Sequence, residues 1–163
     1  MKIILFDLAD TLEHEVRNRD VLMPGALDLL SAVRDMRDYN GDSPALALVS
    51  DFNDPVQDYY ALLRDLEIDI FFKPLKERVT LSNEVGVLKP DEKIFRAAID
   101  KIHKGLRYSD VLFITENKMH SSAVRKLGLM AIRIAAREEG EVDKLTELIP
   151  LIQLFVLTAV HAG

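Results

Sequence analysis

Short apolar runs alternate along this chain with segments whose apolar positions recur every three to four residues. The runs predict buried strands at Lys2 to Phe6, Ala45 to Val49, Arg78 to Leu81, Val111 to Thr115 and Ala131 to Ile134. Strands that alternate with amphipathic helices are typical of a parallel sheet covered on both faces. The pattern therefore predicts an α/β fold: a three-layer, doubly wound, Rossmann-like parallel sheet of about five strands.

Helical periodicity fills the segments between these runs, apart from the polar stretch between Leu12 and Pro24. The predicted helices begin at Pro24-Gly25, at Pro55 with Asp54 as its N-cap, at Pro90-Asp91, at Ser121 and near Val142. The last must kink or restart at Pro150, because proline has no N–H to donate inside a helix. No repeat or interdomain linker is visible, and a length of 163 residues predicts one domain, 1–163.

Composition narrows the class of protein without naming it. With 48% apolar and 29% charged residues, the chain is expected to fold without disulfides or structural metals. A net charge of −6 argues against a nucleic-acid partner, which needs a basic surface. The absence of cysteine excludes thiol chemistry and suits the cytoplasm. The longest apolar stretch is too short and too interrupted to span a bilayer, so we expect no membrane partner.

The chemistry is expected just after the strands, because ligands of such sheets bind beyond the carboxyl ends of the strands. These positions are Asp7, Ala9, Asp10 and Thr11 after the first strand, Ser50 and Asp51 after the second, and Glu116 and Asn117 after the fourth. Lys89 comes from the loop before a helix. Converging carboxylates, a hydroxyl and a lysine favour phosphoryl chemistry with a divalent cation.

Four stretches, in this order, resemble the motifs of the haloacid dehalogenase-like (HAD) hydrolase superfamily. They are Ile3 to Leu12 (IILFDLADTL), Leu46 to Ser50 (LALVS), Ser82 to Phe95 (SNEVGVLKPDEKIF) and Ile114 to Ser121 (ITENKMHS). The first is similar to an apolar strand followed by Asp-x-Asp-x-Thr, and the third to the Ser-x-Glu-x-Gly-x-x-Lys-Pro-Asp-x-x-Ile-Phe pattern of the common phosphatase branch. The resemblance covers nearly the whole chain.

The resemblance implies a Mg²⁺-dependent phosphatase that works through an aspartyl-phosphate. Asp7 would be the nucleophile on phosphorus. Ser50 and Lys89 would bind the phosphoryl group, with Asp51 beside them, and Thr11 would hold the loop as part of the substrate-binding set. Mg²⁺ would be held by Asp7, the main-chain carbonyl of Ala9 and Glu116.

Two departures from the family pattern weaken this expectation. Phosphatases of the family keep a second aspartate, which protonates the leaving group and activates water, where this chain has Ala9. Asp10 is adjacent, but side chains of neighbouring residues in an extended segment point to opposite sides. The phosphonoacetaldehyde hydrolases also have alanine there, but they use a lysine from a helical cap for which the stretch between Leu12 and Pro24 leaves no room.

The fourth motif is also degenerate. Glu116 stands for the usual aspartate, and the second acid becomes His120 or Ser121, depending on where the gap is placed. A replacement base at His120 is one interpretation; a histidine at the helix entry or facing solvent is the safer one.

Three functions stay open. The leading one is a capless hydrolase of weak or unusual activity. Its open site would accept a small-molecule phosphate or a phosphorylated macromolecule. A homo-oligomer, in which a partner subunit covers the site, is also consistent with the missing cap. The second is an inactive member of the fold that binds phosphate or a protein partner. The third is a metal-independent reaction such as dehalogenation, in which Asp7 attacks carbon.

Overall fold

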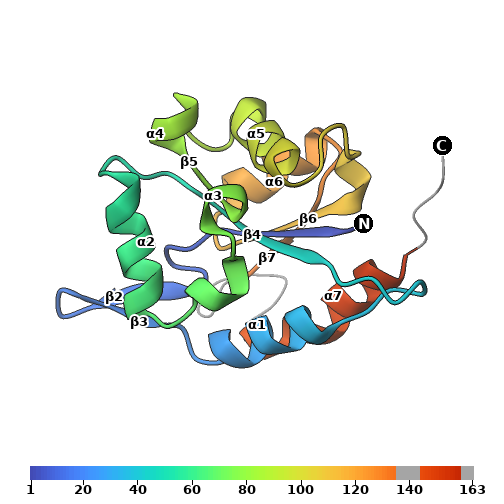
Figure 1. The fold of residues 1–163 in the computed structure, drawn as a ribbon, viewed down its shortest axis with the longest axis horizontal. Coiled ribbons are helices and arrows are strands. Elements are labelled where there is room, and N and C mark those ends of the chain that lie inside the picture. The colour runs from blue at the N-terminus through green and yellow to red at the C-terminus, as the bar shows by residue number, and fades with distance from the viewer. Residues whose placement is uncertain (135–143, 159–163) are drawn as a thin grey trace.

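The computed structural model describes residues 1–134 and 144–158, in which the predicted sheet is found. Five parallel strands lie in the order β5-β4-β1-β6-β7 (Figure 1). Their bounds are Ile3–Phe6 (β1), Ala45–Ser50 (β4), Val79–Leu81 (β5), Val111–Thr115 (β6) and Met130–Arg133 (β7). The chain crosses from one side of β1 to the other between β5 and β6, so the switch point lies where β1 pairs with both β4 and β6.

Alternate residues of the sheet are buried against helices on opposite faces, as two hydrophobic clusters show. On one face Ile4 and Phe6 of β1 pack with residues of α1 (Ala26–Asp35), α2 (Val56–Asp65) and α7 (Leu148–Leu157). On the other face Ile3 and Leu5 pack with residues of α5 (Glu92–Ile102) and α6 (Lys118–Lys126). The prediction of a three-layer α/β fold is confirmed, and Figure 1 shows the sheet between the two helix layers.

The stretch between β1 and α1 forms an antiparallel hairpin, where the sequence predicts only a polar stretch. Its strands are β2 (Glu13–Val16) and β3 (Arg19–Leu22), joined by a two-residue turn. Both turn residues, Arg17 and Asn18, have positive φ, as the tightest hairpin turns require. This hairpin extends from the sheet beside α2 (Figure 1).

Several element boundaries differ from the predicted ones. Pro55 precedes α2 and no side chain caps that helix, so Asp54 is not its N-cap. Helix α6 begins at Lys118, three residues before the predicted Ser121, because Asn117 provides the cap: its side chain accepts from the His120 N–H. At α5 the prediction is confirmed, since Asp91 caps the helix by accepting from the Lys93 N–H.

Short elements complete the fold. They are α3 (Leu75–Arg78), α4 (Ser82–Val85) and three 3₁₀ turns at Asp69–Phe72, Tyr108–Asp110 and Leu145–Glu147. Pro150 lies in the first turn of α7, where a missing N–H is tolerated, so the described helix starts before the proline and continues through it. The predicted start near Val142 lies outside the described residues. No helix in the described ranges has the length and apolar character needed to cross a membrane.

Candidate active site

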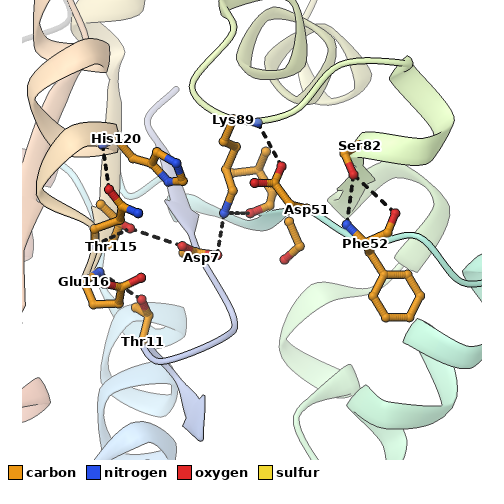
Figure 2. Close-up of polar contacts among 12 residues, drawn as sticks. Asp7, Thr11, Asp51, Phe52, Ser82, Lys89, Thr115, Glu116 and His120 are labelled. Atoms are coloured by element: carbon orange, nitrogen blue, oxygen red, sulfur yellow. Dashed lines mark hydrogen bonds and ion pairs between the residues drawn. The ribbon is translucent and has the colours of Figure 1, made fainter.

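The carboxyl ends of β1, β4 and β6 open into a cavity of about 400 Å³. The predicted residues that line it are Asp7, Ala9, Asp10, Ser50, Asp51, Lys89, Glu116 and His120. Parallel strands end at the same edge of a sheet, so residues far apart in the sequence meet here. Figure 2 shows Asp7 between Lys89 on one side and Thr115 on the other.

A buried ion pair joins the predicted nucleophile to the predicted lysine. Lys89 Nζ lies 2.5 Å from Asp7 Oδ1, and the two side chains are 3% and 8% exposed. Lys89 also donates to the Val49 carbonyl, and Thr115 Oγ1 donates to Asp7 Oδ2 at 3.2 Å. Because an unpaired buried charge is costly, each partner requires the other. The carboxylate is thereby held by donors on both of its oxygens (Figure 2).

Ser50 and Asp51 are held by contacts of their own. Ser50 Oγ and the phenol of Tyr59 lie 2.6 Å apart, and both residues are buried. Tyr59 is fully buried, and burial raises the pKa of its phenol. Asp51 Oδ1 accepts from the Lys89 backbone N–H at 2.8 Å. Asp51 therefore anchors the loop that presents Lys89.

Thr11 positions the loop after β1 and does not reach the cavity. It is completely buried, and its Oγ1 accepts from the Glu116 backbone N–H at 3.1 Å. This contact is the kind that holding the loop requires, and a role of Thr11 in substrate binding stays a prediction. Through this hydrogen bond, the loop after β1 holds the backbone at the end of β6 in place.

Asp10 lies on the cavity, contrary to the expectation of an extended segment. The backbone N–H groups of Thr11, Leu12 and Glu13 all donate to the Leu8 carbonyl, so the chain turns directly after β1. Asp10 has φ 57°, a left-handed conformation that aspartate tolerates better than most residues. The alternation of an extended strand therefore does not apply, and Asp10 lines the cavity together with Ala9.

Glu116 and His120 both line the cavity, whereas Ser121 is buried and donates to the Lys118 carbonyl. Burial raises the pKa of Glu116, and the nearby charges of Asp7 and Asp10 raise it further. Burial, followed by the charge of Lys89, lowers the pKa of His120. Its Nδ1 is buried and has no partner among the described residues. His120 lies in the first turn of α6 and also faces the cavity.

Two acidic residues and an apolar wall of the cavity are not predicted from the sequence. Glu13 and Asp20 come from the hairpin, and Phe52, Tyr59 and Leu62 form a wall on the β4–α2 side. A signal for the hairpin was present: Asn18 is a residue type favoured in two-residue turns. The alternation of Glu13 with His14 and of Glu15 with Val16 gave no clear apolar face that would mark a strand.

The ionised form of Glu13 destabilises the folded state. Burial raises the pKa of its carboxyl from 4.5 to about 7, with smaller contributions from Asp20 and Asp10. A folded-state pKa above the unfolded value means that folding loses stability as the pH rises from 4.5 through 7. We expect Glu13→Gln to stabilise the fold by about 1–3 kcal/mol at pH 8, and by much less at pH 5.

Urea unfolding at both pH values, without divalent cations, measures this effect. Glu15→Gln is the matched control, because Glu15 is exposed on the same strand. A stabilisation by Glu13→Gln that is equal at pH 5 and pH 8 would show that ionisation of Glu13 is not its cause.

The predicted metal donors are all oxygen atoms, the type of ligand that a hard divalent cation prefers. Burial, and then the charges of Asp7 and Asp10, raise the pKa of Glu116. In the described part of the chain no group of three or more His, Asp or Glu side chains is arranged to hold a metal ion. The predicted donor set uses two carboxylates and the Ala9 carbonyl, a combination that Mg²⁺ accepts when water completes its octahedron.

Solved structures with this fold are numerous, although no protein-family model and no curated protein sequence matches the chain. It is similar to the HAD-hydrolase YfnB from Bacillus subtilis, bound to magnesium (21% identity, TM-score 0.64, 80% of this chain and 56% of that one). It is also similar to a β-phosphoglucomutase from Thermotoga maritima. The identity is 12% and the TM-score 0.73, over 94% of this chain and 99% of that one.

A third similar structure is the HAD family enzyme BT-2542 from Bacteroides thetaiotaomicron, in complex with magnesium and inorganic phosphate. Here the identity is 14% and the TM-score 0.65, over 85% of this chain and 96% of that one. The present chain spans little more than half of YfnB but nearly all of the other two. Identities this low establish a common fold. The chain has the fold of the haloacid dehalogenase-like hydrolases.

Proposed function

We propose that this chain hydrolyses phosphate monoesters, with Asp7 as the nucleophile. The observation that carries the proposal is the buried Asp7–Lys89 pair at the floor of a cavity at the sheet's switch point. Asp7 is fixed by two donors, and Lys89 adds positive charge where a phosphoryl group would approach. The magnesium and phosphate bound by similar structures support the same chemistry.

The reaction has two displacements at phosphorus. The Asp7 carboxylate forms a bond to phosphorus while the bond to the ester oxygen breaks, and the leaving alkoxide takes up a proton from water. Water then attacks phosphorus, which releases inorganic phosphate and restores the carboxylate. Lys89 stabilises the charge on the phosphoryl oxygens in both steps, and Ser50, oriented by Tyr59, donates to one of them.

A Mg²⁺ ion bound by Asp7, the Ala9 carbonyl and Glu116 would offset the negative charge between carboxylate and phosphate. The proton transfers are the weak point, because the Ala9 side chain can neither donate nor accept a proton. We therefore propose a slow enzyme that favours esters with good leaving groups. Without a cap after Leu12, a small phosphate ester or a phosphorylated macromolecule could reach the site.

Magnesium dependence tests this function. Release of 4-nitrophenol from its phosphate ester should require Mg²⁺ and stop when EDTA is added. Glu116→Gln should raise the Mg²⁺ concentration for half-maximal rate at least about tenfold, because a neutral amide replaces a charged ligand. Glu77→Gln, an exposed residue of α3, is the control and should leave that concentration unchanged. Activity that is insensitive to EDTA would contradict the proposed metal.

A binding module without catalysis is the second candidate, and the loss of a carboxylate at position 9 favours it. Such a module would bind inorganic phosphate or Mg²⁺ with no release of 4-nitrophenol. Calorimetric titration of the wild type with each ligand, combined with the assay above, separates the two functions.

A further inference from the structure

One face of the β2–β3 hairpin carries only carboxylates among its charged residues. Glu13 pairs with Leu22, and Glu15 pairs with Asp20. Residues paired across two strands lie on the same face, and so do residues two apart in one strand. Glu13, Glu15 and Asp20 therefore share a face. Like charges placed opposite each other destabilise a hairpin, so this arrangement costs stability.

Two of these carboxylates line the active-site cavity. Glu13 and Asp20 both contribute to its wall, whereas Glu15 does not. Glu13 is 7% exposed, and its Oε2 is buried without a hydrogen-bond partner among the described residues. Within residues 1–134 and 144–158, no ion pair involves Glu13 or Asp20. A carboxylate that lines a cavity, and that has one buried oxygen without a partner among the described residues, points to a ligand that donates to it.

The positive charges already assigned to the cavity do not neutralise this wall. Six carboxylates line the cavity: Asp7, Asp10, Glu13, Asp20, Asp51 and Glu116. Among the described residues, Lys89 is the one lysine or arginine that lines it, and its ammonium lies against Asp7. The proposed Mg²⁺ donors are on the loops after β1 and β6. In the part of the chain that the structure describes, the hairpin carboxylates Glu13 and Asp20 therefore have no cation paired with them.

We propose that Glu13 and Asp20 form a subsite for a positively charged amino group on the alcohol part of the substrate. The proposal rests on phosphate monoester hydrolysis at Asp7 and names the substrate class for it. With the phosphoryl group at Asp7 and Lys89, the alcohol part of the ester extends between the hairpin and the apolar wall of Phe52, Tyr59 and Leu62. An ammonium on a short apolar body complements both sides of this space.

The charge state of Glu13 agrees with the proposal. Its pKa is raised to about 7 because burial and the neighbouring carboxylates disfavour a further negative charge. A bound ammonium beside Glu13 would favour its ionised form, because an opposite charge stabilises the carboxylate. Substrate binding would then reduce the repulsion among the carboxylates of the hairpin face. Residues at functional sites commonly reduce the stability of the free protein in this way.

O-phosphoethanolamine and propyl phosphate form a matched pair of substrates, because they have the same chain length and differ in one terminal ammonium or methyl group. For the wild type we expect kcat/KM for O-phosphoethanolamine to exceed that for propyl phosphate by about ten- to a hundredfold, the range for hydrogen bonds to charged groups. Glu13→Gln and Asp20→Asn should each reduce this ratio at least about fivefold. Glu15→Gln removes the same charge from the same face outside the cavity and should keep the ratio.

A binding measurement distinguishes the amine subsite from the proposed phosphatase activity. Calorimetry with the Asp7→Asn variant should show tighter binding of O-phosphoethanolamine than of propyl phosphate, with or without any catalysis by the wild type. Hydrolysis of both esters at equal efficiency would overturn the amine subsite and leave the phosphatase intact. Preferential binding of the amine with no hydrolysis of any ester would support the subsite and overturn the phosphatase. Loss of a second bound Mg²⁺ in Glu13→Gln, with an unchanged ester ratio, would assign the carboxylates to a metal and overturn the subsite.

Discussion

Replacing Asp7 with asparagine is expected to reduce the release of phosphate from 4-nitrophenyl phosphate at least about a thousandfold. The amide has the shape of the carboxylate but cannot attack phosphorus to form an acyl-phosphate. It also leaves the buried ammonium of Lys89 without its counter-charge. Steady-state rates of the purified variant, with saturating Mg²⁺, measure the effect.

The control for this variant is Asp65→Asn, which removes a carboxylate from an exposed position at the end of α2. Thermal unfolding of Asp7→Asn must show a cooperative transition, so that a lost rate is not lost structure. Equal rates for the wild type and a folded Asp7→Asn protein would remove Asp7 from the reaction.

Introducing aspartate at position 9 is expected to raise the turnover of an alkyl phosphate such as propyl phosphate by about 10²–10⁴-fold, the usual contribution of a general acid–base group. Ala9 is exposed and lines the cavity, so a larger side chain has room there. Neighbouring carboxylates such as Asp7 and Asp10 would raise the pKa of the new acid and keep it able to donate a proton.

Two comparisons make the Ala9→Asp result specific. Ala9→Asn has nearly the same shape but cannot transfer the proton, so it should not raise the rate. The gain should be smaller for 4-nitrophenyl phosphate, whose leaving group departs without a proton. A rate on propyl phosphate that Ala9→Asp leaves unchanged would contradict the view that the missing acid limits catalysis.

The parts of the site that follow buried strands could be predicted from the sequence. Asp7, Ser50 and Glu116 each come directly after an apolar run, and the geometry of parallel strands brings such positions together. Lys89 could be placed only through its resemblance to a known motif, because it reaches Asp7 from a loop 82 residues away in sequence.

The parts that depend on backbone turns or tertiary charge could not be predicted. A positive φ at Asp10 reverses the expectation from strand alternation, and no local pattern marked that turn. The hairpin face has like charges in register, which contradicts ordinary strand preferences. The buried, unpartnered Glu13 becomes visible only when the hairpin lies against the cavity.

The most direct test of the account is to trap the phosphoryl group on the protein. Wild-type protein is mixed with Mg²⁺ and ³²P-labelled 4-nitrophenyl phosphate, quenched with acid within the first turnover, and digested so that the labelled peptide can be identified. Since Ala9 cannot activate water, the second displacement should be slow and the intermediate should accumulate. We predict label on the peptide that contains Asp7, and less of it in Ala9→Asp. Release of phosphate by the wild type with no label on Asp7 would contradict the proposed mechanism.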